Sequence, residues 1–244
     1  MGRALFHNLG SGWNPLWLGS GLVAWWDPEI GVTKDGITNR VSAWADRIAA
    51  TSLVQAAGAA QFLWQAAASE MNGRASLYGD ANRFMGIVSA PVALRVTQQA
   101  HTFLLVTRAS GDQVGNGTAA GSMLLMRYSS KVRTHIWATG ALATRDGLTT
   151  ISPTTQQLVG QIATGAPGTG VLTPILNGAS DNTSVAIGGT ATTPNPSFVL
   201  GSRGFGVGSD TLNGYVGDVF IFNRALTSEE LIQMARWTSL RWSI

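Results

Sequence analysis

Cysteine is absent from this chain of 244 residues, and charged residues are sparse. Without cysteine, no disulfide can staple the fold, and no thiol can act in catalysis or bind a metal. Asp, Glu, Lys and Arg make up 12% of the residues and give a formal net charge of +3. A surface with so few charges is typical of a protein that partners cover in part, although monomers of low charge exist.

Lysine is scarce: Lys34 and Lys131 are the only lysines, and the arginines are scattered singly. No run of basic residues could follow a phosphate backbone, so we expect no nucleic-acid partner. No stretch is long and apolar enough to span a bilayer, so we expect no membrane partner. Near the start, polar residues such as His7 and Asn8 interrupt the apolar core that a secretory signal requires.

Glutamate is equally scarce, which bears on glycoside hydrolysis. That reaction uses two carboxylates facing the sugar, about 5–5.5 Å apart when the configuration is retained. Glu29, Glu70, Glu229 and Glu230 are the only glutamates, and none lies in an acidic array on one strand. Asp218 is the only acid inside an expected strand, and it has no acidic neighbour in the sequence. We therefore expect no glycosidase activity.

Nucleophilic catalysis is not indicated either. The sequence has no Gly-x-Ser-x-Gly motif, which would hold a serine nucleophile on a sharp turn after a strand. His7, His101 and His135 are far apart in the sequence, with no carboxylate at a suggestive spacing. A lone histidine beside strand residues is ordinarily a packed or surface side chain. The chain is thus expected not to be an enzyme and to need no cofactor.

Glycine and tryptophan are plentiful, with 30 and nine residues, which suits many turns between aromatic-rich strands. Short β-type segments separated by turn residues are typical of a sandwich. Two of the turns are expected at Ser129-Ser130 and at Asn177-Gly178. The expected strands of the central and C-terminal parts are 101–108, 122–128, 132–138, 157–163, 171–176, 184–187, 197–202 and 215–222.

The C-terminal stretch has the clearest local signals. Asn213 and Gly214 both tolerate positive φ, which predicts a turn. The apolar residues of 215–222 then predict a strand covered on both faces. Thr227 and Glu230 have the spacing of a capping box, in which each side chain binds the other residue's backbone N–H. An amphipathic helix is expected to follow.

Several of these segments together resemble the concanavalin A-like lectin/glucanase domains, and in particular their laminin-G-like members in bacterial surface proteins and phage virion proteins. The resemblance extends over roughly 20–242 and implies one domain. The matching segments are 22–27 (LVAWWD), 41–46 (VSAWAD), 72–74 (NGR), 78–80 (YGD) and 223–230 (NRALTSEE).

The fold expected from the pattern and the resemblance is all-β: a two-sheet antiparallel jelly-roll sandwich with one short C-terminal α-helix. Residues 21–244 would form this domain, and residues 1–20 an N-terminal arm. The alanine-rich stretch 42–70 favours helix by propensity. Gly58 interrupts it, and the family has a loop and short strands there, so we expect mostly extended or irregular structure.

We expect a function without catalysis, because the residues that catalysis needs are missing, and the resemblance to phage virion proteins indicates which function. Our main prediction is a structural or decoration protein of a virion, in the capsid or tail of a tailed phage, with other virion proteins and further copies of itself as partners. The alternative is a carbohydrate-binding adhesion module of a phage fibre or a bacterial surface, with a cell-surface glycan as partner. One fold hosts many functions, so residues must decide between them.

Candidate residues for glycan or partner contacts are aromatic and polar side chains outside the core motifs: Trp64, Trp137, Asn182, Arg203 and Asp210. Trp25, Trp26 and Trp44 lie in the family-like motifs, and we assign them to the core. Phe6, Trp13 and Trp17 would be the anchors of the arm. They fold over the sandwich itself or dock on a neighbouring subunit, and the sequence does not decide which.

A calcium site is the one metal site that the composition leaves open. Asn177, Asp181 and Asn182 lie in one loop and could supply the oxygen ligands that calcium prefers. Asn and Asp are also the ordinary residues of turns, and this is the interpretation we favour. We therefore expect no bound metal.

Overall fold

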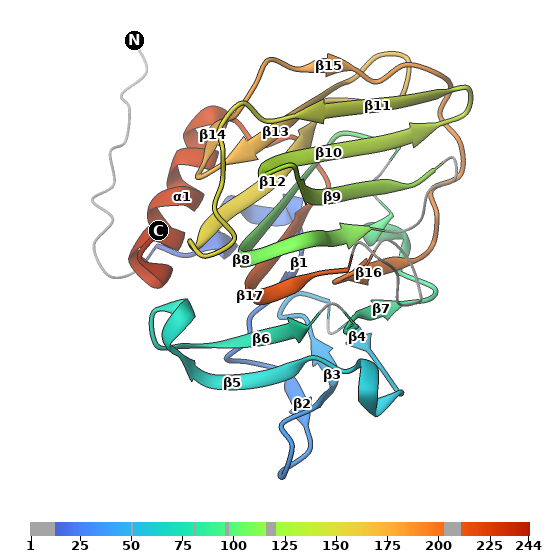
Figure 1. Cartoon of the computed structure of the whole chain (residues 1–244). Helices are drawn as coiled ribbons and strands as arrows, with labels where there is room; N and C mark the ends of the chain where they lie inside the picture. The colour runs from blue at the N-terminus through green and yellow to red at the C-terminus, as the bar shows by residue number, and fades with distance from the viewer. Residues whose placement is uncertain (1–12, 50, 81, 96–97, 116–120, 203–210) are drawn as a thin grey trace.

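The structure, a computed structural model, describes residues 13–49, 51–80, 82–95, 98–115, 121–202 and 211–244. Strands dominate it, with one α-helix at its C-terminal end (Figure 1). The elements in chain order are η1 (Pro15–Gly21), β1 (Leu22–Trp26), β2 (Val32–Lys34), β3 (Val41–Ala45), β4 (Ser52–Val54), η2 (Gly58–Ala60), β5 (Leu63–Ala68), η3 (Ser69–Met71), β6 (Arg74–Asp80), β7 (Met85–Ile87), η4 (Val92–Leu94), β8 (His101–Gly115), β9 (Met123–Tyr128), β10 (Lys131–Ala138), β11 (Ala141–Asp146), β12 (Gln157–Ala163), β13 (Val171–Leu176), β14 (Ala179–Ser180), β15 (Val185–Ala186), β16 (Phe198–Leu200), β17 (Asn213–Phe222) and α1 (Ser228–Trp242).

Two antiparallel sheets pack face to face, and β8 belongs to both. Sheet A has the order β5–β6–β17–β8–β12–β13, with β1 also on β17 and with β14 and β15 on β13. Sheet B has the order β2–β3–β4–β7–β16–β8–β9–β10–β11. Gly111, where β8 passes from sheet A to sheet B, has a φ of 80°, which glycine adopts at little cost. The predicted all-β sandwich is confirmed.

One apolar cluster fills the space between the sheets, and a second lies between the outer face of sheet A and α1. Trp26 and Trp44 belong to the first cluster and Trp25 to the second, so their assignment to the core is confirmed. Aromatic side chains of this size bury large apolar areas, and removing one from a core typically costs ~3–5 kcal/mol.

The last strand lies near the middle of sheet A and is covered on both faces, as its apolar sequence predicted. The turn predicted at Asn213 and Gly214 is wrong, because both residues already belong to β17 and pair with β6 and β8. Gly214 has a φ of 138°, and a Cβ there would collide with the Arg108 carbonyl and with Ala109. Its lack of a side chain serves close strand pairing here instead of a turn.

The predicted capping box at the start of α1 is confirmed. The Thr227 hydroxyl accepts a hydrogen bond from Glu230 N at 3.2 Å, and Glu230 Oε2 accepts one from Thr227 N at 2.8 Å. Arg224 also forms an ion pair with Glu230 at 2.7 Å, and its hydrogen bond lowers the pKa of that carboxyl. Arg224 reaches back to the Leu18 carbonyl, which joins the helix start to η1.

The other local predictions are confirmed in outline. Ser129 and Ser130 have positive φ in the tight connection between β9 and β10, and so do Asn177 and Gly178 between β13 and β14. The alanine-rich stretch 42–70 holds short strands and single 3-10 turns, with no α-helix in its described residues. No helix in the described part of the chain is long and apolar enough to cross a membrane.

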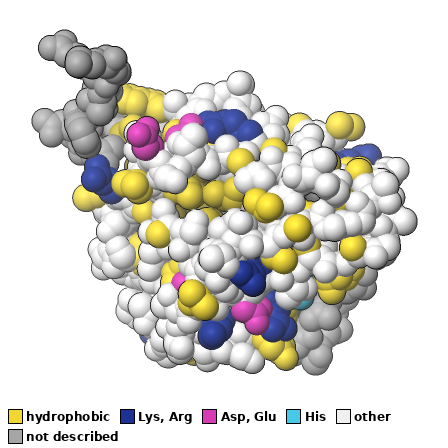
Figure 2. Space-filling view, turned by 90° about the horizontal axis from the view of Figure 1, so that it is seen from above, with side chains coloured by type: hydrophobic (Ala, Val, Ile, Leu, Met, Phe, Trp, Pro, Cys, Tyr) yellow, Lys and Arg dark blue, Asp and Glu magenta, His cyan; other side chains and the backbone are white. Residues whose placement is uncertain are grey.

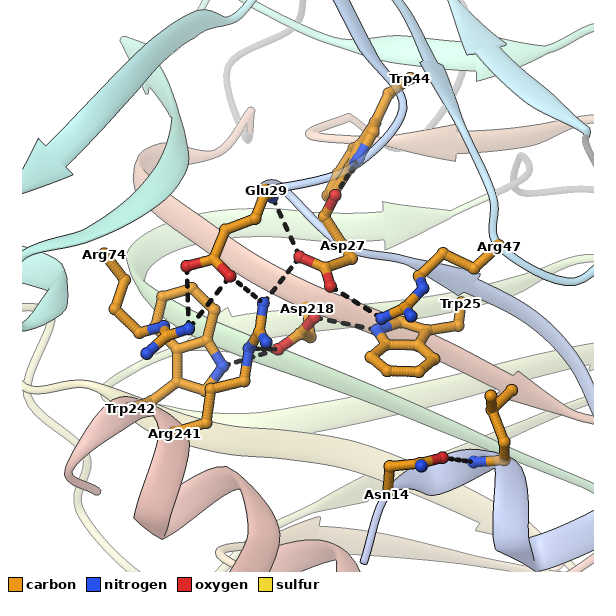
Figure 3. A network of polar contacts seen from close by, with 11 residues as sticks. Asn14, Trp25, Asp27, Glu29, Trp44, Arg47, Arg74, Asp218, Arg241 and Trp242 are labelled. Atoms are coloured by element: carbon orange, nitrogen blue, oxygen red, sulfur yellow. Dashed lines mark hydrogen bonds and ion pairs between the residues drawn. The ribbon is translucent and has the colours of Figure 1, made fainter. Parts of the chain in front are cut away.

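A buried ionic cluster ties the C-terminal end of α1 to sheet A (Figure 3). Arg241 lies 2.7 Å from Asp27, which follows β1, and 2.9 Å from Asp218 on β17. The indole N–H groups of Trp25 and Trp242 donate to the two oxygens of Asp218, at 2.9 and 2.7 Å. We call Asp27, Asp218 and Arg241, together with these two indoles, the α1 clasp.

The fold gives Asp218 an acidic neighbour that the sequence does not show. Asp218 has no acidic neighbour in the sequence, but the pairing of β1 with β17 brings Asp27 close to it. Asp218 is fully buried, and burial raises its pKa to about 6; Arg241 opposes this shift and Asp27 adds to it. Its ionised form is therefore tolerated near neutral pH only because Arg241 and the two indoles are in place.

We predict that Arg241→Met lowers the free energy of unfolding by ~3–5 kcal/mol at neutral pH, because it removes the cation beside the buried Asp218, whereas Asp27 keeps its ion pair with Arg47. Arg236→Met is the matched control, since Arg236 is exposed on the same helix and its replacement should change stability by less than ~0.5 kcal/mol. Urea denaturation of both variants measures the difference. Equal stabilities would show that the clasp does not hold the helix.

We also predict how stability depends on pH. The pKa of Asp218 is about 6 in the folded chain against 3.8 in the unfolded chain, so between these values the folded state binds more protons. Stability from this group is then greatest below pH 3.8 and falls as pH rises through 6, by about 3 kcal/mol in total.

Urea denaturation between pH 4 and 6.5 measures this slope. Asp218→Asn should flatten this part of the stability profile. A profile that kept its slope in Asp218→Asn would assign the titration to another group.

Candidate functional site

The outer face of sheet B over β9, β10 and β11 is where two sequence-predicted candidates come together. Along β10 the side chains alternate: Val132 and Ile136 point into the core, whereas Arg133, His135 and Trp137 are half-buried on the outer face. A strand rises about 3.4 Å per residue, so the side chains from Lys131 to Trp137 span roughly 20 Å. We call this surface the β10 face.

One end of the β10 face carries an ordered charge pair. Arg133 Nε and Nη2 bind Asp146 Oδ1 and Oδ2 at 2.5 and 2.6 Å, and the guanidinium lies 3.6 Å from the centroid of the Tyr128 ring. This hydrogen bonding lowers the pKa of Asp146 and raises that of Arg133, so both are ionised at neutral pH. Figure 2 shows such a group of acidic and basic side chains beside a histidine at its lower edge.

The other end of the β10 face is aromatic. The rings of His135 and Trp137 stack with centroids 5.1 Å apart and planes at 25°. His135 Nδ1 lies 2.8 Å from the Thr144 hydroxyl on β11, which fixes the imidazole. Leu142 pairs with Trp137 and is 50% exposed, so solvent reaches the apolar end of the face. Aromatic rings next to oriented polar groups are the usual elements of a small-molecule site.

Asn182 borders the same surface. Its Nδ2 donates to the Asp146 carbonyl at 2.7 Å, and Arg145 binds the neighbouring Thr183, so the loop after β14 is tied to the end of β11. The structure therefore places Trp137 and Asn182 on or beside one face. Trp64 is elsewhere: β5 lies at the opposite end of the molecule from β10 (Figure 1). Its indole donates to the Pro28 carbonyl.

Of the five remaining candidates, two lie in the described part of the chain and three lie outside it. Arg203 and Asp210 lie outside the described residues, and so does Phe6 of the predicted arm. Trp13 packs against the apolar cluster under α1. Trp17, on η1, is 63% exposed. The described end of the arm thus contacts its own domain while it presents one tryptophan to solvent.

The loop considered for calcium uses most of its oxygens internally. Asn177 Oδ1 accepts from Leu158 N at 3.0 Å, and Asn182 binds backbone groups. Asp181 is buried and accepts from Thr149 N. Among the described residues, no group of three or more His, Cys, Asp or Glu side chains is placed to hold a metal ion. The turn interpretation accounts for these contacts.

The acids that the fold does bring together are not arranged for hydrolysis. Asp27 and Asp218 are 1% and 0% exposed and share Arg241, so a sugar cannot reach them. Glu29 binds Arg74 and Arg241, and Glu230 belongs to the helix cap. A glycosidase needs two carboxyl groups that both reach the scissile bond, and these acids do not provide them.

The fold and this face define a lectin-like antiparallel β-sandwich. A family model of the laminin G type, described as the concanavalin A-like lectin/glucanases superfamily, matches residues 88–232. The match covers more than half of the chain, so the chain belongs to this superfamily. A search of curated proteins finds no match.

Solved structures show the same fold at low sequence identity. The CBM40 of the Ruminococcus gnavus IT-sialidase bound to α2,3-sialyllactose is 16% identical, with 66% of this chain and 96% of that chain covered and a TM-score of 0.52. Domain 4 of the arabinanase AbnA from Geobacillus stearothermophilus, in complex with arabinotriose, is 13% identical, with 88% and 98% covered and a TM-score of 0.55. The binding domain of Paraclostridial Mosquitocidal Protein 1 is 10% identical, with 76% and 49% covered and a TM-score of 0.56.

The side chains that surround Trp137 on the β10 face were not predicted from the sequence. His135 was treated as an isolated histidine, and Arg133, Asp146 and Tyr128 were not considered. Strand alternation could have placed Arg133, His135 and Trp137 on one face, because they are two residues apart. The pairing of Arg133 with Asp146 depends on the register of β10 and β11, which the sequence does not specify.

Proposed function

We propose that this protein binds carbohydrate through the β10 face and does not act on it. The observation that carries the proposal is the half-buried Trp137, stacked on His135 at one end of a face whose other end holds Tyr128 and the ordered Arg133–Asp146 pair. A tryptophan ring can cover one face of a sugar ring while guanidinium, carboxylate and hydroxyl groups bind its hydroxyls.

The geometry suits an extended ligand better than a single sugar. The charged side chain of Arg133 and the indole of Trp137 lie roughly 14 Å apart along β10. Their side chains are fixed before binding by stacking and by ion pairing, so little rotamer entropy remains to be lost. A linear oligosaccharide of several units could lie along the strand and contact both ends.

Two structural neighbours support the ligand class. The solved CBM40 holds sialyllactose and domain 4 of AbnA holds arabinotriose, and both share the sandwich with this chain. At 16% and 13% identity they indicate no particular sugar. The ligand of this chain has to be found by experiment, with a glycan array as the first step.

We predict that Trp137→Ala weakens binding to any glycan that the wild-type chain retains on an array by roughly 30-fold, which corresponds to ~2 kcal/mol for a central aromatic contact. Trp17→Ala and Trp64→Ala are the matched controls, because Trp17 is exposed on η1 and Trp64 lies on the distant β5. Both controls should bind as the wild-type chain does.

Two results would contradict the proposal. The first is a wild-type chain that binds no glycan of the array. The second is a Trp137→Ala variant that binds as the wild-type chain does, which would place binding away from the β10 face. Thermal melting of each variant distinguishes lost binding from lost folding.

The decoration role in a virion stays a prediction, with the exposed Trp17 as the observation that favours it. A tryptophan that is 63% exposed next to Leu16, at 46%, is a natural anchor for another subunit. Trp17→Ala tests it: in an assembling system the variant should fold but lose incorporation into the particle. Normal incorporation would remove this anchor from the hypothesis.

A further inference from the structure

A second surface, away from the β10 face, has the form of a binding site. It is a cleft of about 450 Å³ between η3, the segment before β12 and the end of α1. Polar side chains line it, among them Glu70, Arg108, Thr155, Gln156 and Gln157. Clefts of this size with convergent polar groups are where small ligands usually bind.

Arg108, which lines the cleft, belongs to a row of side chains that crosses sheet A. Tyr78 pairs with Tyr215, and Tyr215 pairs with Arg108, so the three lie side by side on the outer face. The two tyrosine rings contact each other with centroids 5.0 Å apart. An aromatic pair thus lies beside the guanidinium that lines the cleft.

The wall formed by η3 is fixed in place. Arg108 Nη1 and Gln156 Nε2 both donate to the Glu70 carbonyl, at 2.9 and 2.8 Å. The Glu70 backbone N–H and the Ser69 hydroxyl bind the Glu70 carboxylate and lower its pKa. The carboxylate is therefore ionised at neutral pH and held at the edge of the cleft.

The charges of the lining balance. Among the side chains of the lining there are one guanidinium and one carboxylate, and the remaining polar side chains carry amides and hydroxyls. An anionic ligand would be opposed by Glu70 and a cationic one by Arg108. Amides offer both donors and acceptors, which suits a neutral ligand with many hydroxyl groups.

We infer that this cleft is a second carbohydrate site, which takes a neutral sugar unit and is separate from the β10 face. Its ligand class rests on the proposed function, but its residues do not overlap with those of the β10 face. Two sites on one domain would let the chain hold two glycans, or two units of one branched glycan, and so gain avidity.

Amide NMR of the full chain tests the inference, with cellobiose, lactose and maltose as probes. We expect at least one of them to shift the amides of residues 69–72 and 154–157. Thr155→Trp, which fills the cleft from its exposed rim, should weaken this binding at least about tenfold. Thr154→Trp is a second blocking variant, and Ser89→Trp, at an exposed serine outside the cleft, is the control.

A charged probe tests the ligand class. Because Arg108 attracts an anion and Glu70 repels it, glucuronate should shift the cleft amides no more than glucose does. Larger shifts with glucuronate would overturn the assignment of a neutral ligand.

The outcomes distinguish the two sites. If the cleft amides shift in Trp137→Ala as in the wild type, the second site stands on its own. If only the amides of β9 to β11 shift, the inference fails while the proposed function stands. If no cleft amide shifts with any neutral probe, or if both blocking variants bind as Ser89→Trp does, the cleft is not a sugar site.

Discussion

Arg241 bridges two carboxylates that the fold buries together. Asp27 and Asp218 meet because β1 pairs with β17. Asp27 also pairs with Arg47, whereas the ionised form of Asp218 would be unfavourable in the interior without the Arg241 guanidinium. Trp25 and Trp242 complete the hydrogen bonds of Asp218 and carry apolar rings into the cluster under α1. The position of the helix on sheet A thus depends on one buried ionic contact and the apolar packing around it.

The position of α1 on sheet A leaves two candidate ligand surfaces uncovered. The helix covers the outer face of sheet A over β8, β12 and β17, whereas the outer face of sheet B over β9 to β11 carries no helix among the described residues. Trp137 and the Arg133–Asp146 pair lie on that open face. The polar cleft lies at the end of α1, where the helix leaves the rim of sheet A uncovered. The cleft is thus bounded by the helix that the clasp holds, whereas the β10 face lies on the sheet that the helix does not contact.

Sequence reasoning succeeded where the signal was local. The Thr227–Glu230 cap follows from spacing alone, and the strand expected at 132–138 follows from its β-type residues. It failed where the local structure depends on pairing between segments that are far apart in the sequence. Gly214 has the residue type of a turn but serves close pairing with β8, and Asp218 gains an acidic neighbour that is 191 positions away in the numbering. The site shows the same division, because Trp137 could be proposed from its residue type whereas its polar partners required the register of three strands.

We propose the open face of sheet B, with Trp137 as its aromatic contact, as the ligand surface of this lectin-like sandwich. A crystal structure of the chain with an oligosaccharide that it binds tests this most directly. We expect a sugar ring stacked on the Trp137 indole, with hydrogen bonds from the Arg133–Asp146 end to the units that follow. A bound oligosaccharide that leaves Trp137 uncovered and lies elsewhere on the molecule would contradict the claim.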